Sequence, residues 1–169
     1  NHRGIPAHEV ARRHLVHFYP ATFHSFVARM DWAQSGAGNR EPIVSVNGDE
    51  GIRPLHVVAA PGSALSLDAS ASRDPDGHPL RFAWWSQPEA GTYAGLIRID
   101  GTNSARPTLV VPADAAGKTL HLICEVTDEG TPPLTRYRRL IIETKATADT
   151  QRPRVVVLTD FPPLDVIPV

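Results

Sequence analysis

The amino-acid sequence predicts a mainly β protein, an antiparallel β-sandwich preceded by one amphipathic helix. Three observations support this prediction. After Pro42 the apolar residues alternate with a period of two, turn-forming residues separate the apolar runs at short intervals, and 16 of the 169 residues are prolines spread along the chain. Alternation of this kind is typical of strands with one buried face, and scattered prolines suit short strands joined by turns.

One helix is expected before the strands. Within residues 20–34, Phe23, Phe26, Val27 and Met30 stand at i, i+3, i+4 and i+7, which is the spacing of an amphipathic helix. The glycine-rich segment 35–39 should end it. Residues 1–19 hold a second apolar cluster without a clear cap, and a proline at position 20 should interrupt any helix that continues through it.

The strands are expected from Pro42 onward, where turn sequences such as Asp74-Pro75-Asp76-Gly77 separate the apolar runs. Seven or eight strands in about 105 residues match an immunoglobulin-like sandwich. In the run 80–85, alternation should turn Trp84 toward the core, against a buried Cys124, and Trp85 toward the other side. The expected strands are 43–46, 55–59, 64–69, 80–85, 96–99, 108–111, 120–127 and 136–144.

Composition and charge exclude several classes of function. With a net charge of −1, the chain has no excess of positive charge that would attract nucleic acid or an anionic membrane. The apolar runs are too short to span a bilayer. The single cysteine allows neither an internal disulfide nor a four-cysteine zinc site. No nucleophile elbow or phosphate-binding loop is present, which favours a binding or accessory module. The one basic cluster, Arg136, Arg138 and Arg139, is expected to be a solvated strand edge.

Two groups of residues are candidate sites. Trp85 and Tyr93 offer flat apolar faces on which sugars stack, although a tryptophan on the outer sheet face also suits packing against a neighbouring domain. Asp74 and Asp76 in one turn, with Asp128 and Glu129 in another, should meet at one end of the sandwich and form a calcium site. The alternative is that each aspartate stabilises its own turn.

The sequence also resembles two known kinds of protein. Residues 67–84 resemble the second strand, turn and third strand of PKD-type repeats of extracellular bacterial proteins. Four segments taken together are similar to the C-terminal part of the cellulose-binding, nucleoside-hydrolase-like protein family: residues 26–32, 84–93, 111–118 and 126–139.

The second resemblance implies an Ig-like domain that follows a nucleoside-hydrolase-like domain. Residues 1–40 would be the helical tail of such a domain plus a linker, 41–145 the sandwich, and 146–169 a linker and the first strand of a further, truncated hydrolase-like domain. The non-alternating apolar run 155–158 is consistent with a buried strand of a parallel sheet. Asp160 matches a metal-site aspartate of the family, but its partner carboxylates are absent, so no catalytic site is expected.

The favoured function is therefore a non-catalytic accessory module associated with polysaccharide, in a secreted, periplasmic or cell-surface bacterial protein. Its expected partners are the hydrolase-like domain and polysaccharide, and its one candidate cofactor is calcium. The alternatives are an incomplete part of an N-ribosyl or glycosidic hydrolase, and a calcium-stabilised adhesion or spacer domain. Without its partner domain, the helix should fold back onto the sandwich or dimerise, and residues 146–169 should be extended and poorly packed.

Overall fold

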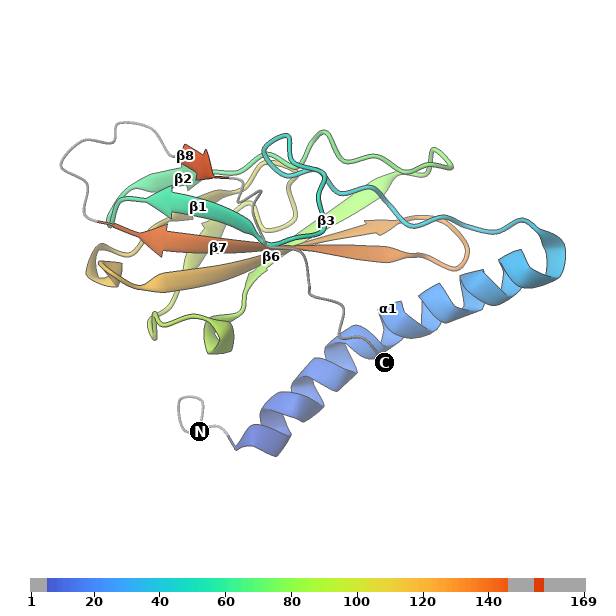
Figure 1. Ribbon diagram of the computed structural model, residues 1–169, viewed down its shortest axis with the longest axis horizontal. Coiled ribbons are helices and arrows are strands. Elements are labelled where there is room, and N and C mark those ends of the chain that lie inside the picture. Colours follow the sequence, from blue (N-terminus) through green and yellow to red (C-terminus); the bar gives the residue numbers. More distant parts are fainter. Residues whose placement is uncertain (1–5, 146–153, 157–169) are drawn as a thin grey trace, which may run out of the picture.

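The computed structural model of the chain describes residues 6–145 and the backbone of residues 154–156. A long helix, α1 (Ala7–Ser35), precedes a two-layered β fold (Figure 1). Two short 3₁₀ helices, η1 (Pro88–Ala90) and η2 (Ala113–Ala115), connect strands. The strands are β1 (Leu55–Ala59), β2 (Ala64–Ser66), β3 (Leu80–Ser86), β4 (Arg98–Asp100), β5 (Thr108–Val110), β6 (Thr119–Asp128), β7 (Thr135–Thr144) and β8 (Arg154–Val156).

The strands form two sheets. A five-stranded sheet has the order β3-β6-β7-β1-β8, and a three-stranded sheet has the order β2-β5-β4. β1 runs parallel to β7, and the other paired strands are antiparallel. The prediction of a mainly β sandwich preceded by a helix is confirmed.

The core between the sheets follows the predicted alternation. Trp84 on β3 is 3% exposed and faces Cys124 on β6, which is fully buried. The indole Nε1 of Trp84 donates a hydrogen bond to the carbonyl of Ser104 at 3.0 Å, so its polar atom is also satisfied. Burial raises the pKa of the Cys124 thiol to about 12, which keeps it a neutral apolar side chain.

Helix α1 is longer than the sequence predicted. It continues through Pro20, so the expected interruption at that residue is wrong. Contacts with the sandwich on both sides of the proline, at His14 and His24, hold the two halves in place and offset the hydrogen bond that proline removes. The helix ends as predicted, where Gly36 takes the left-handed conformation and its N–H donates to the Trp32 carbonyl at 2.9 Å.

Residues 43–46 form no strand. They make isolated bridges between Ile43 and Arg73 and between Val46 and Asp49. The Ser45 N–H donates to the side chain of Ser72 at 3.0 Å, a bond that replaces the ladder contact of a strand. Side-chain competition of this kind explains why an apolar run remains a loop.

The apolar run near the C-terminus takes an unexpected place. Residues 154–156 form β8, which pairs antiparallel with β1 at the edge of the five-stranded sheet, with Val155 opposite Val57. These three residues are extended, as expected, and the free edge of β1 accepts their backbone groups. That residues 146–169 begin a further domain stays a prediction. Residues 146–153 and 157–169, including Asp160, lie outside the described residues.

A candidate ligand surface on the outer sheet face

The candidate site lies on the face of the five-stranded sheet that points away from the core. Because successive side chains of a strand point to opposite faces, burial of Trp84 turns Ala83 and Trp85 outward. The register places Ala83 of β3 opposite Glu125 of β6, and Glu125 opposite Tyr137 of β7. Three neighbouring strands thus bring an indole, a carboxylate and a phenol onto one surface.

Glu125 is the centre of this group. Its Oε2 accepts a hydrogen bond from the indole Nε1 of Trp85 at 3.3 Å and lies 3.3 Å from Nε2 of His17 on α1. Burial and the negative charge of Glu125 raise the pKa of Tyr137 to about 12. The phenol therefore keeps its proton at neutral pH and remains a hydrogen-bond donor.

Helix α1 covers one side of this surface. The ring of His17 packs edge-on against Trp85 with 4.9 Å between centroids, and Phe18 lies 5.1 Å from Tyr137 in the same geometry. Trp85 is consequently half-buried rather than fully exposed. Its accessible part is what a ligand could contact.

Two hollows flank the group. One, of about 620 Å³, is lined by Leu80, Arg81, Phe82, Ala83, Asn103, Glu125 and Thr127. The other, of about 480 Å³, lies between α1 and β7 and is lined by Phe18, Ala21, Thr22, Ser25, Phe26, Arg29, Glu41, Thr135 and Tyr137. Both combine apolar walls with a few charged or hydroxyl groups, and both are in the size range of small-molecule sites.

Tyr93 lies elsewhere. Its ring belongs to the core, with 9% of the residue exposed, and its hydroxyl donates to Asp114 Oδ1 at 2.8 Å. The Tyr93 N–H donates to the carbonyl of Thr119, which holds this segment against the start of β6. The structure therefore does not bring Trp85 and Tyr93 together on one surface as the sequence suggested, and Trp85 alone of the two faces the candidate site.

The two acidic turns do meet at one end of the sandwich, as predicted. Asn39 and Arg40 join them, because the Asn39 side chain donates to Asp128 Oδ1 at 2.9 Å while the Arg40 N–H donates to Asp76 Oδ2 at 2.8 Å. The backbone N–H of Glu129 also donates to the carbonyl of Pro79. The loops are thus neighbours, but their carboxylates are engaged separately.

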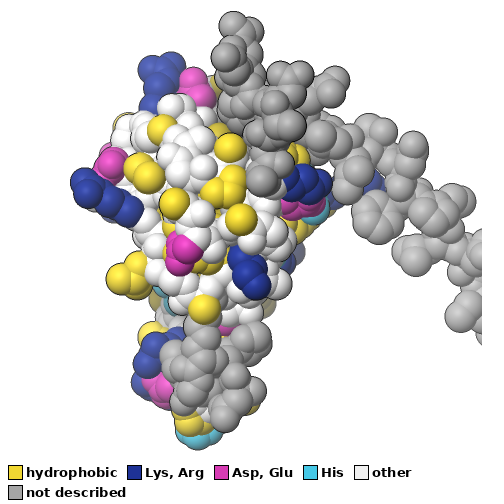
Figure 2. All heavy atoms as spheres, turned by 90° about the vertical axis from the view of Figure 1, so that its left-hand side faces the viewer, with side chains coloured by type: hydrophobic (Ala, Val, Ile, Leu, Met, Phe, Trp, Pro, Cys, Tyr) yellow, Lys and Arg dark blue, Asp and Glu magenta, His cyan; other side chains and the backbone are white. Residues whose placement is uncertain are grey.

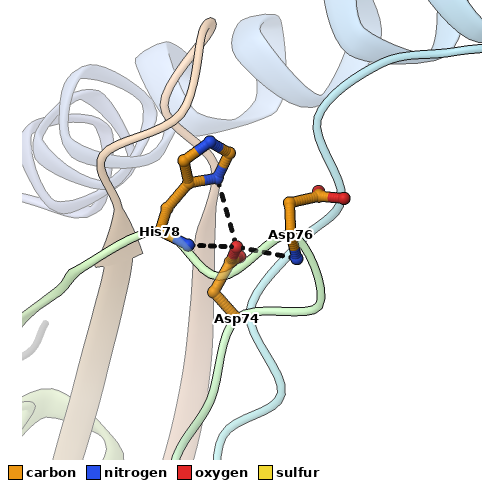
Figure 3. A group of neighbouring side chains, drawn as sticks. All are labelled: Asp74, Asp76 and His78. Carbon is orange, nitrogen blue, oxygen red and sulfur yellow. Dashed lines mark hydrogen bonds and ion pairs between the residues drawn. The ribbon is translucent and has the colours of Figure 1, made fainter.

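Figure 3 shows how the first turn is held. Asp74 Oδ1 accepts the backbone N–H groups of Asp76 at 3.0 Å and His78 at 2.9 Å, and His78 Nδ1 lies 3.1 Å from the same oxygen. The carboxylate of Asp76 points away from Asp74 and pairs with the Arg40 guanidinium, which lowers its pKa. Asp74 and Asp76 with His78 are close enough in space to hold a metal ion.

The second turn uses its acid differently. Asp128 is fully buried, and its Oδ1 accepts the N–H groups of Gly130 and Leu134 as well as the Asn39 side chain. Glu129 is half-exposed and lies 3.8 Å from Arg81. Because Asp128 and Glu129 are outside the spatial group around Asp74, the four acids do not form one donor set. Calcium binding stays a prediction.

Sequence reasoning missed Glu125 and His17. The signal for Glu125 was present: if Leu122, Cys124 and Val126 face inward, the residue between the last two faces outward beside Trp85. His17 had no such signal, since its position depends on which face of α1 lies on the sheet. The basic cluster was also misjudged, because β7 is a central strand and Arg138 is buried beside Asp49.

Comparison with known proteins gives these features a context. Residues 64–144 match the family described as "Cellulose-binding protein Sde0182, C-terminal domain", which confirms the resemblance expected from the sequence. No curated protein matches the chain. Among solved structures, a nucleoside hydrolase-related hypothetical protein from Saccharophagus degradans, associated with carbohydrate metabolism, is 36% identical with a TM-score of 0.75.

That alignment covers 76% of this chain and 32% of the S. degradans protein, so the chain spans about a third of its relative. A second similar structure is the PKD domain from KIAA 1837 protein, at 16% identity and a TM-score of 0.41, covering 68% of this chain and 97% of that domain.

Proposed function

Because residues 64–144 match the family of the Sde0182 C-terminal domain, we propose that this chain is a polysaccharide-binding accessory module without catalysis of its own. The family description names cellulose binding, and the solved relative is associated with carbohydrate metabolism. We extend cellulose binding and the association with carbohydrate metabolism to this chain. We also propose that it is a bacterial protein with a secreted, periplasmic or cell-surface location.

The outer sheet face supports this proposal. A sugar ring needs a flat apolar surface for its C–H groups and nearby polar groups for its hydroxyls. Trp85 supplies the first, and Glu125 with Asn103 and Arg81 beside the larger hollow supplies the second. The observation that carries the proposal is the hydrogen bond from the half-buried Trp85 indole to Glu125, a carboxylate that lines the larger hollow.

The relation to a hydrolase-like domain is a second part of the proposal. Residues 1–40 would connect such a domain to the sandwich of residues 41–145, and residues 146–169 would lead to a further one. The support is the length of the solved relative, of which this chain matches 32%. In this arrangement the sandwich holds the hydrolase-like domain near polysaccharide.

The experiment for glycan binding compares the half-buried Trp85 with a fully exposed apolar side chain. We expect Trp85→Ala to reduce retention of the chain on insoluble cellulose at least tenfold, whereas Leu96→Ala, at a residue that is 96% exposed, leaves retention unchanged. Circular dichroism should show both variants folded. Equal retention of Trp85→Ala and the unsubstituted chain would remove the outer face as the binding surface.

The absence of catalysis is tested separately. We expect the purified 169-residue chain to release no ribose from purine or pyrimidine nucleosides, because it matches 32% of its solved relative and the matched family describes a C-terminal domain. Turnover that is lost in Asp160→Ala would favour the alternative, in which the chain is part of a working hydrolase.

A further inference from the structure

Helix α1 has two different faces. The inner face lies on the sandwich and is built mainly from polar and small residues, with Phe18 packed against Trp85 and Tyr137. His14 Nε2 lies 2.7 Å from Glu89 Oε1, Ser25 Oγ donates to Glu41 at 2.8 Å, and Ala28 is 1% exposed. The helix therefore does fold back onto the sandwich, as one of the two expected outcomes, but not through its apolar stripe.

The apolar residues occupy the opposite face, which we call the outer stripe. Their exposed fractions run from 49% to 65%, and Tyr19 and Phe23 stack on each other at 6.2 Å between centroids. At 100° per residue, all of them fall within an arc of about 100° that excludes the ring contacts of His17 and Phe18 with the sheet. Phe26, near the edge of this arc, also lines the hollow between α1 and β7. The outer stripe consists of Leu15, Val16, Tyr19, Phe23, Phe26 and Met30.

The spacing within the outer stripe is that of a helix-pairing seam. Val16, Tyr19, Phe23, Phe26 and Met30 are separated by three, four, three and four residues, the alternation by which two helices interlock side chains. Packing of a helix onto its own domain requires apolar residues on the inner face, and it does not require this alternation on the solvent side. A second helix is what the seam fits.

The size of the outer stripe also indicates a partner. Six large side chains exposed to this degree leave on the order of 700 Å² of mostly apolar surface, more than monomeric proteins commonly leave in one patch. Stable interfaces bury about 800 Å² per partner. By contrast, the end of the sandwich seen in Figure 2 shows hydrophobic side chains scattered among polar ones.

We propose that the outer stripe binds the outer stripe of a second copy of this chain, in an antiparallel helix pair centred on Phe23. Arg12 continues the same seam one step before Val16. A parallel pair would set the two Arg12 guanidinium groups against each other, whereas an antiparallel pair separates them by most of the helix length. It also sets Val16 against Met30 and Tyr19 against Phe26 of the second copy, so each aromatic ring meets another.

The oligomeric state tests the proposal directly. Sedimentation equilibrium of the 169-residue chain should show a monomer–dimer equilibrium at micromolar concentration. Phe23→Glu should raise the dissociation constant at least tenfold, because it places two carboxylates at the centre of the seam. Ala11→Glu adds the same charge at an exposed position of the same helix outside the arc of the stripe, and it should keep the dimer. A chain that stays monomeric at all concentrations, as it would if another domain were the true occupant, overturns the proposal.

Cysteine cross-linking tests the orientation. The native Cys124 is buried and should not react. Phe23→Cys should form a disulfide-linked dimer on mild oxidation, and the double variant Val16→Cys with Met30→Cys should do the same. Val16→Cys alone should not, because 14 residues of helix rise, roughly 20 Å, separate the two position-16 side chains in an antiparallel pair. Efficient dimers from Val16→Cys alone would contradict the antiparallel pairing. None of these results depends on polysaccharide binding.

Discussion

The five-stranded sheet is packed on both faces: one face forms the interior of the sandwich, and the other carries helix α1. These two packed regions are built differently. Inside, long-range strand pairing and buried aliphatic side chains form one continuous cluster. Outside, the helix rests on single contacts, such as His14 with Glu89 and His17 with Glu125, with a hollow of about 480 Å³ between it and β7. The first region is held by buried area, the second by a few polar pairs and aromatic ring contacts.

This difference teaches which sequence patterns determine contacts within the chain. The period-two alternation of β6 identifies the residues that it contributes to the sandwich core, Leu120, Leu122, Cys124 and Val126, because both layers of that core belong to this chain. The apolar pattern of α1 describes a surface that the chain leaves exposed. A hydrophobic stripe thus predicts burial, but the structure decides whether the partner is the same domain, another domain or a second copy.

The largest effect is expected inside the sandwich, from Trp84→Ala. Its indole is buried between the sheets and also donates to the Ser104 carbonyl, so truncation leaves a cavity and an unpaired acceptor. We expect the free energy of unfolding to fall by about 3 to 5 kcal/mol. Urea denaturation followed by circular dichroism measures the change. A loss below that of Trp85→Ala would show that the outer face, not the interior, dominates stability.

Asp128→Ala should have the next largest effect, because this fully buried acid joins the segment before the sandwich to the β6–β7 turn. Its removal leaves the N–H groups of Gly130 and Leu134 without this acceptor. The Asn39 amide loses one of two acceptors and keeps the Pro132 carbonyl. We expect a loss of about 2 to 3 kcal/mol by thermal or urea unfolding. A matched substitution, Asp76→Ala, removes an acid that is exposed and pairs with Arg40, and it should lower stability far less.

The same two aspartates show what the sequence could predict about the candidate sites. Ig-like topology correctly placed both turns at one end, since that follows from strand order. It could not show that Asp128 turns inward toward three amide donors, one of which belongs to Asn39, 89 residues away in the chain. Likewise, alternation placed Trp85 outward, but its contact with His17 required knowing which face of α1 lies on the sheet. Pairwise contacts at long separation were beyond a single sequence.

Alkaline pH should distinguish the two regions to a smaller degree. The pKa of Tyr137 is raised to about 12 in the folded state, above its ordinary value near 10, because the half-buried phenolate would lie beside Glu125. Stability from the neutral phenol is complete below pH 10 and is lost as the pH rises toward 12, since the unfolded state releases its proton first.

We expect this loss to be on the order of 1 kcal/mol, allowing for partial solvent screening. Tyr137→Phe, which keeps the ring against Phe18 but cannot ionise, should flatten the fall in the unfolding free energy between pH 10 and 12. The buried Cys124 thiol, whose pKa is also raised to about 12, contributes a parallel fall that the variant keeps. If the unfolding free energy of Tyr137→Phe fell with pH as steeply as that of the unsubstituted chain, the whole fall would come from the interior of the sandwich.

The smallest effect on overall stability is expected from His17→Ala, where α1 contacts the outer face of the sheet. The His17 side chain is 45% exposed and pairs with a partly exposed Glu125, and ion pairs of this kind contribute about 0 to 1 kcal/mol. Yet the substitution removes both the pair and the edge-on contact with Trp85, so it should act strongly on the helix alone. Native-state hydrogen exchange measures this: amides of residues 14–28 should lose protection, while those of β6 keep theirs, because the helix opens without unfolding the sandwich. Equal loss of protection in α1 and β6 would show that the helix and the interior unfold as one unit, and the distinction between the two regions would not hold.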